Sequence, residues 1–163
     1  MRENTAKRKM LAGQPAFGYT LQLGAPLVAE ALADCGIDFI LLDTQHGTFG
    51  SDSIIATLMA LSCGHAVPMA RVARNDYTLI GRLLDDGALG IIVPLVHTRE
   101  DAQAVADACR FPPLGKRSWG WGRARVYGSD YPEWIDRELF VAVQIESAQA
   151  VENAEAILSV PGI

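Results

Sequence analysis

Five short strand-like runs, each followed by a segment with helical spacing, constrain the fold of this chain more than any other feature. The runs are mostly apolar, are bounded by turn residues and are too short for helices, which is typical of strands in a buried parallel sheet. They span residues 16–23, 38–43, 67–72, 89–95 and 140–145. Regular alternation of strands and helices predicts an α/β fold made of βα units.

Helices are expected where apolar residues recur at a spacing of three or four positions. These segments are residues 4–11, 26–33, 52–61, 77–85, 98–110 and 148–158. Side chains that commonly cap helices stand at their starts, namely Asn4 or Thr5, Ser51 or Asp52, Asn75 or Asp76, Thr98, and Ser147.

Residues 111–138 show neither period and are rich in Gly, Pro and aromatic side chains. A loop of this length in a compact domain is usually a lid or a binding loop, so we expect an active-site or assembly loop here. Trp119 and Trp121, each beside a glycine, fit a lid or an assembly contact better than a nucleic-acid stack, because the net charge of −5 disfavours nucleic acid.

The even length of the βα units fits a barrel better than an open sheet. A closed barrel of eight such units takes about 250 residues and rarely fewer than about 200, whereas this chain has 163. We therefore expect one domain over residues 1–163 that forms the first five units of a (β/α)8 TIM barrel. A sequence cut from a longer protein explains this better than a sheet completed by another chain, because an unfinished barrel leaves open strand edges.

Composition excludes several classes of function. The net charge of −5 argues against non-specific binding of nucleic acid. No apolar run approaches the roughly 20 residues of a membrane span, and the N-terminal residues lack the apolar core of a signal peptide. The three cysteines are far apart and have no metal-ligand spacing, which predicts reduced thiols in a cytoplasmic protein.

Polar residues stand where the expected strands end. The second strand is followed by Asp43 and His46, the third ends at Arg71, and the fifth is followed by Gln144 and Glu146. Because the C-terminal ends of parallel strands meet at one rim, we expect these side chains to lie together. The pattern therefore predicts an active site at that rim.

The chemistry that this set allows is narrow. The carboxylates of Asp43 and Glu146 suit Mg²⁺ or Mn²⁺, as ligands or as groups that support ligands. Arg71 offers a planar fork to a carboxylate or a developing enolate, and His46 is the natural proton carrier near neutral pH. Together these groups suit proton abstraction beside a carbonyl whose oxygen is polarised by a metal.

Each residue also has a purely structural explanation. Arg71 can form an ordinary ion pair, Gln144 can satisfy a buried backbone group, and Glu146 can serve as the first-turn acid of the last helix. Asp85 ends the helix after the third strand and can be a helix-end residue without a role. The residues alone leave these alternatives open.

The ordered motifs resemble those of the HpcH/HpaI aldolase family, the metal-dependent 2-keto-acid aldolases. Any single motif is weak, but the set covers most of residues 36–163 in the family's order. The matching segments are residues 36–47, 70–76, 83–88, 90–96, 110–117 and 143–146.

The resemblance implies a (β/α)8 barrel that assembles into a homo-oligomer, a trimer or a hexamer. It also implies a divalent metal (Mg²⁺, Mn²⁺ or Co²⁺) that binds the carboxylate and keto oxygen of pyruvate or a similar 2-keto acid. The implied reaction cleaves a 4-hydroxy-2-keto acid to that keto acid and an aldehyde. The partners are therefore small molecules, with no nucleic acid and no membrane.

By motif, His46 matches the family's catalytic histidine, and Asp85 matches the aspartate that pairs with it across a subunit boundary. Arg71 matches the arginine that binds substrate and stabilises the enolate, and Glu146 matches one metal ligand. Gln144 and Asp43 match family residues that support the metal and the substrate.

The chain also departs from the family pattern. The second metal carboxylate is expected after a sixth strand, beyond Ile163, so the activity is expected of the full-length protein rather than of these residues alone. Gln45 replaces a Glu that often precedes the histidine, and residues 118–121 are bulkier than expected, which can alter the choice of aldehyde. The alternatives are a non-catalytic fragment, or a related decarboxylase or acyl-CoA lyase on the same fold.

Overall fold

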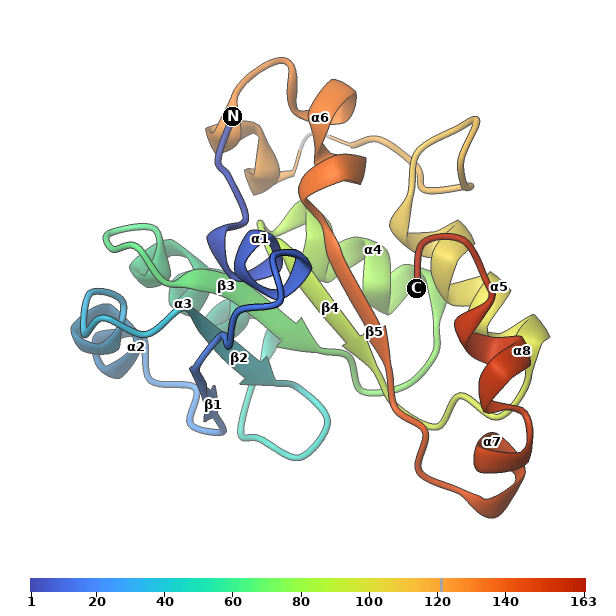
Figure 1. Cartoon of the computed structure of the whole chain (residues 1–163). Helices are drawn as coiled ribbons and strands as arrows, with labels where there is room; N and C mark the ends of the chain where they lie inside the picture. Colours follow the sequence, from blue (N-terminus) through green and yellow to red (C-terminus); the bar gives the residue numbers. More distant parts are fainter. Residues whose placement is uncertain (121) are drawn as a thin grey trace.

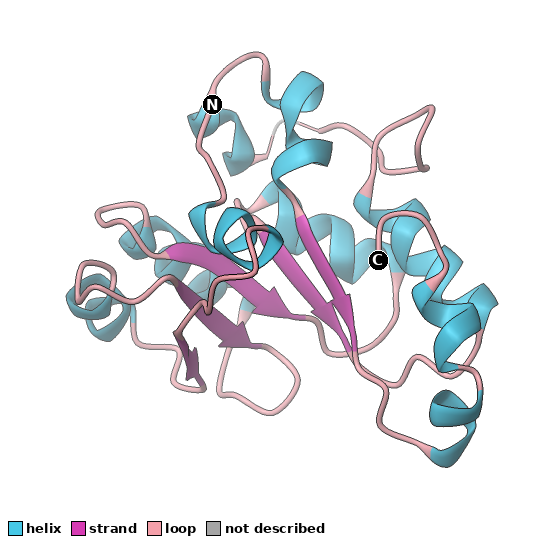
Figure 2. Ribbon diagram, in the orientation of Figure 1, coloured by secondary structure: helices cyan, strands magenta, loops and turns pink. Residues whose placement is uncertain are grey.

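The computed structural model describes residues 1–120 and 122–163 and shows one parallel sheet with helices packed against it (Figures 1 and 2). The strand order β1-β2-β3-β4-β5 follows the sequence, and every neighbouring pair is parallel. The strands are β1 (Gly18–Leu21), β2 (Phe39–Asp43), β3 (Val67–Arg71), β4 (Gly90–Val93) and β5 (Phe140–Val143). The predicted α/β fold with a parallel sheet is thus confirmed.

Helices connect these strands, and most of the expected caps are confirmed. The helical elements are α1 (Thr5–Leu11), α2 (Pro26–Leu32), α3 (Ser51–Leu61), α4 (Tyr77–Asp85), α5 (Arg99–Cys109), the 3₁₀ helix η1 (Arg123–Tyr127), α6 (Tyr131–Glu138), α7 (Ala148–Glu152) and α8 (Ala154–Leu158). Side chains that accept from a backbone N–H three residues ahead are those of Asn4, Asp76, Thr98 and Ser147. The expected cap of α3 at Ser51 or Asp52 is wrong, because Gly50 takes that position.

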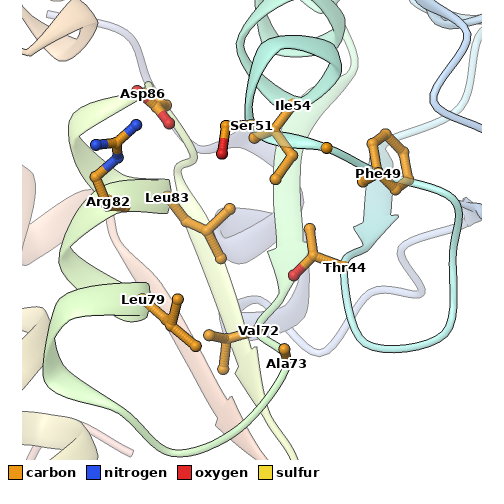
Figure 3. Close-up of a pocket in the computed structure, with 11 residues that line it drawn as sticks. Thr44, Phe49, Ser51, Ile54, Val72, Ala73, Leu79, Arg82, Leu83 and Asp86 are labelled. Atoms are coloured by element: carbon orange, nitrogen blue, oxygen red, sulfur yellow. The ribbon is translucent and has the colours of Figure 1, made fainter.

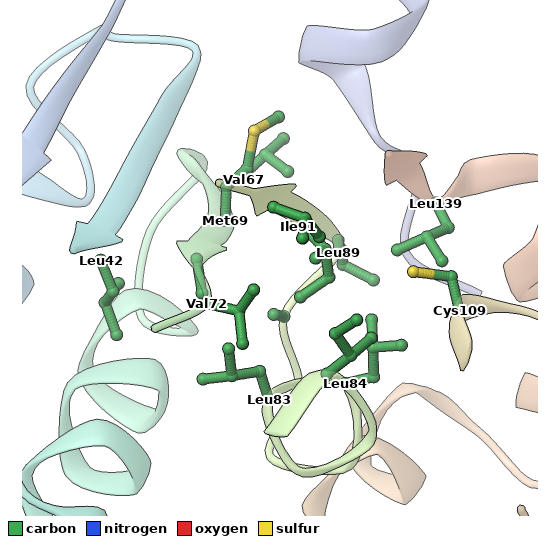
Figure 4. Close-up of a cluster of buried hydrophobic side chains, with 14 of the residues drawn as sticks. Leu42, Val67, Met69, Val72, Leu83, Leu84, Leu89, Ile91, Cys109 and Leu139 are labelled. Carbon is green, nitrogen blue, oxygen red and sulfur yellow. The ribbon is translucent and has the colours of Figure 1, made fainter. Parts of the chain in front are cut away.

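The apolar core lies between the sheet and its connecting helices. Leu42 and Ile91 of the sheet and Leu83 and Leu84 of α4 are all buried in this core (Figure 4). Full burial of such a side chain contributes about 1.5–3 kcal/mol. The core therefore fixes which side chains of each strand face the helices and which face the other side of the sheet.

Helix α1 lies across the N-terminal ends of the strands (Figure 1). The Asn4 side chain donates to the Leu89 carbonyl just before β4, and its backbone N–H donates to Glu138 just before β5. Lys9 forms an ion pair of 2.5 Å with Asp38 just before β2. These contacts close that end of the sheet and leave the C-terminal end for the loops that follow the strands.

The expectation of an irregular segment throughout residues 111–138 is wrong, because α6 and η1 lie within it. Helix α6 buries Tyr131, Trp134, Ile135 and Glu138, which have helical spacing. The apolar pattern is cut short at Glu138, a buried carboxylate that pairs with Arg8 at 2.6 Å. Since that partner lies far away in the sequence, the local pattern did not reveal the helix.

The expected single helix over residues 148–158 is also wrong, because Asn153 separates α7 from α8. Its side-chain Nδ2 donates to the His97 carbonyl at 2.9 Å, and its backbone leaves the helical conformation. The first and last strands are shorter than expected. Regular pairing stops at Leu21 and Val143, and the residues beyond form loops at the rim.

Within the described residues, β1 and β5 are the edges of the sheet. Phe17 and Tyr19 at the β1 edge are 68% and 56% exposed. Closure of this sheet into an eight-stranded barrel stays a prediction. None of the helices in this part of the chain has the length and apolar character of a membrane span.

Candidate active site

Asp43 and Arg71 form the centre of the candidate site. They are direct partners in the register between β2 and β3, at the last position of each strand. Arg71 Nε donates to Asp43 Oδ1 at 3.0 Å, and Nη2 donates to Oδ2 at 2.6 Å. This two-pronged geometry is the strong form of an arginine–carboxylate pair and fixes the plane of the guanidinium.

Asp43 is fully buried, and several donors surround its carboxylate. Oδ1 also accepts from the backbone N–H groups of Gln45 and His46, both at 3.1 Å, and Oδ2 accepts from Gln22 Nε2 at 3.2 Å. Burial alone raises the pKa of Asp43, but the hydrogen bonds from Arg71, the His46 amide and Gln22 outweigh it, so this pKa lies well below its usual range. Asp43 is therefore a charged group that supports its neighbours rather than one free to bind a cation.

Glu146 follows β5 and reaches the same rim. Its Oε1 accepts from the Leu95 backbone N–H at 2.7 Å, and Leu95 has a φ of 56° in the loop after β4. Asp43 above all, and Glu146 to a lesser degree, raise the pKa of Arg71. The guanidinium is thus held in its charged form between two carboxylates.

Gln144 shows an unsatisfied group at this rim. Its backbone N–H donates to the Val93 carbonyl at 2.9 Å, which continues the pairing of β4 with β5. Its side-chain Oε1 is buried and has no hydrogen-bond partner among the described residues. Because an unpaired buried acceptor costs about 1–3 kcal/mol, a ligand that approaches this oxygen would remove a penalty.

His46 lies in the loop after β2, and its side chain is exposed. The turn that carries it depends on Gly47, because a Cβ at that position would collide with the carbonyl oxygens of Asp43 and Gln22. The backbone N–H of His46 is fixed by Asp43 at 3.1 Å, while its ring is open to a substrate.

Asp85 does not lie at this rim within one chain. Helix α4 leads from the C-terminal end of β3 back toward the start of β4, and Asp85 is its last residue. The carboxylate of Asp85 accepts from Arg117 Nη2 at 2.9 Å. The structure thus brings Asp43, Arg71 and Glu146 together, whereas Asp85 of the same chain lies away from His46.

The oxygen atoms at the rim fit one side of a Mg²⁺ or Mn²⁺ site. Glu146 supplies a carboxylate and Gln144 an unpaired amide oxygen, and both are hard ligands. No group of three or more His, Cys, Asp or Glu side chains converges in the part of the chain that the structure describes.

Two supporting residues were missed in the sequence. Gln22, which follows β1, contacts Asp43, and Thr44 Oγ1 donates to the Arg71 carbonyl at 2.6 Å. A signal for Gln22 was present, because it is a polar residue at a strand end, like the residues that were selected. The role of Thr44 depends on the β2–β3 pairing and has no sequence signal.

A cavity of about 430 Å³ lies beside this site but on the helix side of the sheet, between α3 and α4 (Figure 3). Its walls are mostly apolar, with a charged pair at one end. The lining includes Thr44, Phe49, Ile54, Val72, Leu79, Leu83, Arg82 and Asp86. Burial raises the pKa of Asp86, and Arg82 opposes the shift. Thr44 lines this cavity and also contacts Arg71, but none of the residues selected from the sequence lines it, so the cavity adjoins the candidate site without containing its charged groups.

Curated proteins with similar sequences are named as aldolases. The hydroxypyruvate/pyruvate aldolase of Rhizorhabdus wittichii is 40% identical over 152 residues, which cover 93% of this chain and 61% of that protein. The 4-hydroxy-2-oxovalerate aldolase of Rhodococcus jostii is 38% identical over 167 residues, which cover 98% of this chain and 63% of that protein. The chain therefore spans about three fifths of the length of these curated relatives.

A solved structure and a family sequence model extend the comparison. The crystal structure of a HpcH/HpaI aldolase/citrate lyase family protein from Burkholderia cenocepacia matches with a TM-score of 0.91 and 32% identity, over 98% of this chain and 66% of that one. The sequence model described as HpcH/HpaI aldolase/citrate lyase matches residues 18–163. This chain therefore belongs to the HpcH/HpaI aldolase/citrate lyase family.

Proposed function

We propose that the full-length protein is a divalent-metal-dependent aldolase of the cytoplasm. It cleaves 4-hydroxy-2-keto acids to pyruvate or a related 2-keto acid and an aldehyde, within a closed (β/α)8 barrel. The observation that carries this proposal is the Asp43–Arg71 pair at the same rim as Glu146 and the unpaired Gln144 oxygen. The names of the relatives, which are aldolases of hydroxypyruvate/pyruvate and of 4-hydroxy-2-oxovalerate, support the same reaction class.

Arg71 stabilises the enolate in this proposal. Asp43 engages its Nε and Nη2, and no partner of Nη1 is found among residues 1–120 and 122–163. Nη1 is thus left to donate to the substrate. A fixed donor aimed at a developing negative charge is worth about 10²–10³ in rate.

Glu146 and Gln144 are the residues that would hold the cation and the keto acid beside it. When bound, a divalent cation polarises the keto oxygen and favours the enolate. A second carboxylate comes from outside these residues, as the family resemblance implies. The Glu146 contact with Leu95 orients the carboxylate and leaves its other oxygen for this task.

The retro-aldol step moves one proton and breaks one bond. The C4 hydroxyl loses its proton, the C4–O bond becomes the aldehyde carbonyl, and the C3–C4 electron pair passes into the enolate. The enolate then takes one proton from water at C3 to give the keto acid, which balances the proton lost by the C4 hydroxyl. His46 accepts the hydroxyl proton, and Asp85 of a second copy in a homo-oligomeric trimer or hexamer orients its imidazole.

A decarboxylase or acyl-CoA lyase on the same fold is the second candidate. The decarboxylase is favoured by the position of Asp85 at the end of α4, away from the strand ends that carry His46 and Arg71, because an enolate-forming reaction without a hydroxyl proton needs only the Arg71 side of the site. Oxaloacetate decarboxylation is such a reaction. Parallel assays of aldol cleavage and decarboxylation separate the two candidates.

Titration of the full-length protein with Mn²⁺, followed by electron paramagnetic resonance, tests whether the site binds a cation. We expect saturable binding that becomes tighter when pyruvate is added, because substrate oxygens complete the ligand shell. Absence of saturable binding, with and without pyruvate, would contradict the proposal and would favour a non-catalytic protein.

A further inference from the structure

A second arginine, Arg117, is buried on the inner side of Asp85, in a part of the fold away from Arg71. Its side chain is 1% exposed, whereas that of Asp85 is 28% exposed. Nη2 donates to Asp85 Oδ1 at 2.9 Å, and Nη1 donates to the Tyr131 hydroxyl at 3.1 Å. The guanidinium thus connects a partly exposed carboxylate to the interior of the segment over residues 111–138.

Aromatic rings enclose this guanidinium. Its central carbon lies 4.5 Å from the ring centre of Phe111 and 5.5 Å from that of Tyr131. Trp119 stacks on Tyr131 with ring centres 5.5 Å apart and planes inclined by 24°. Such stacking holds an arginine in one orientation.

Burial of a guanidinium is costly unless an anion compensates it. In the described part of the chain, Asp85 is the salt-bridge partner of Arg117, and Nε of Arg117 has no hydrogen-bond partner. The segment 111–138 thus buries a charged group whose strongest contact is with one carboxylate. A purely structural anchor does not need a charge in this position, because an apolar side chain fills such a space at less cost.

The backbone of the same segment also surrounds Asp85. A Cβ at Gly122 would lie 2.7 Å from the Cβ and the carbonyl oxygen of Asp85, and a Cβ at Gly120 would lie 3.8 Å from Oδ2. Glycine at position 122 therefore permits a contact that any side chain would prevent. Asp85 is enclosed on one side by Arg117 and on another by this backbone.

We propose that Arg117 is a positioning residue for the reaction: it holds the Asp85 carboxylate in the orientation needed to align His46 of a second copy of this chain. The inference rests on the proposed function, because it uses the His46–Asp85 pair. Alignment is sensitive to small displacements, and an error of 1 Å can cost about a hundredfold in rate. The rings of Phe111 and Tyr131 then hold the guanidinium of Arg117 in one orientation.

The test compares Arg117→Met with its neighbour variant Lys116→Met in the full-length protein. Methionine keeps a long side chain between the rings but removes the charge. Lys116 is exposed and pairs with Asp107 instead. We expect Arg117→Met to lower kcat for aldol cleavage at least about tenfold. This is a part of the rate acceleration of about 10²–10⁴-fold that general acid–base catalysis supplies. KM and oxaloacetate decarboxylation stay unchanged, and Lys116→Met matches the wild type in every assay.

A double-mutant cycle with Asp85→Asn shows whether Arg117 acts through Asp85. If it does, the double variant is no slower in aldol cleavage than Asp85→Asn alone. Effects that multiply would overturn the inference. If Asp85→Asn cleaves the aldol substrate at the normal rate, both the His46–Asp85 pair and this inference are overturned. If Asp85→Asn is slow but Arg117→Met is normal, only this inference is overturned.

Tyr131→Phe keeps the test decisive if Arg117→Met does not fold. It removes the hydroxyl that accepts from Arg117 Nη1 and leaves the ring in place. We expect a smaller fall in kcat for aldol cleavage, with decarboxylation retained. An equal fall in both reactions would show a general structural effect and would contradict the positioning role.

Discussion

Asp43 and Arg71 are joined by two hydrogen bonds of 3.0 and 2.6 Å across the ends of β2 and β3. Their register fixes the pair before any substrate arrives. The pair also connects two further parts of the site, since Asp43 holds the His46 backbone and Glu146 adds to the attraction at Arg71. Asp43 therefore organises the rim, and we expect its removal to affect both folding and turnover.

Asp43→Asn is expected to destabilise the fold by about 3–5 kcal/mol, the usual cost of removing one partner of a buried ion pair. The neutral amide cannot accept both guanidinium hydrogen bonds, and Arg71 is left without its main counter-charge. Urea unfolding at neutral pH measures the change. The variant Asp52→Asn, at an exposed position in the first turn of α3, is the matched control. Equal stability of both variants would contradict this role of Asp43.

The pH dependence of stability follows from the same group. The pKa of Asp43 is depressed in the folded protein, so its contribution is present above the unfolded value of about 3.9 and is lost as pH falls toward the folded pKa. The free energy of unfolding of the wild type should therefore fall below about pH 4 more steeply than that of Asp43→Asn. Urea midpoints between pH 2.5 and 6 measure the two slopes, and parallel curves would refute the assignment.

Gly47→Ala is expected to disturb the turn that carries His46. The new Cβ would collide with two backbone carbonyl oxygens, which cannot move without loss of the β2 strand end. Loss of about 1–3 kcal/mol in stability is the expected effect of such overpacking, together with slower aldol cleavage. Gly81→Ala is the control, because nothing lies within 4 Å of a Cβ there. A Gly47→Ala variant as stable and active as Gly81→Ala would show that the turn is not constrained.

Glu146→Gln is expected to weaken Mn²⁺ binding at least about tenfold, because it removes a rim carboxylate that, unlike Asp43, forms no hydrogen bond with Arg71. The amide has a similar shape, so the contact with the Leu95 N–H can persist. Glu152→Gln at the end of α7 is the matched control, since Glu152 is exposed and lies away from the strand ends. Unchanged Mn²⁺ affinity in Glu146→Gln would exclude it as a ligand.

The parallel sheet and most of its rim could be predicted because both depend on local patterns. Short apolar runs give the strands, and polar residues at their ends give Asp43, Arg71 and Glu146. Contacts between distant residues were not predictable in this way. Helix α6 is obscured by the Glu138–Arg8 pair, and the split at Asn153 depends on the His97 carbonyl. The Arg117–Asp85 pair was not predictable either, because it joins two segments and neither segment alone indicates the contact.

The most direct test of the account compares His46→Ala and Arg71→Ala in aldol cleavage and in oxaloacetate decarboxylation, with His65→Ala as an exposed control histidine. In the proposed mechanism, Arg71 stabilises the enolate in both reactions, whereas His46 accepts only the hydroxyl proton of aldol cleavage. We predict that Arg71→Ala lowers both rates at least about a hundredfold and that His46→Ala lowers only aldol cleavage by that factor. Near-normal aldol cleavage in either variant, with folding intact, would contradict the account.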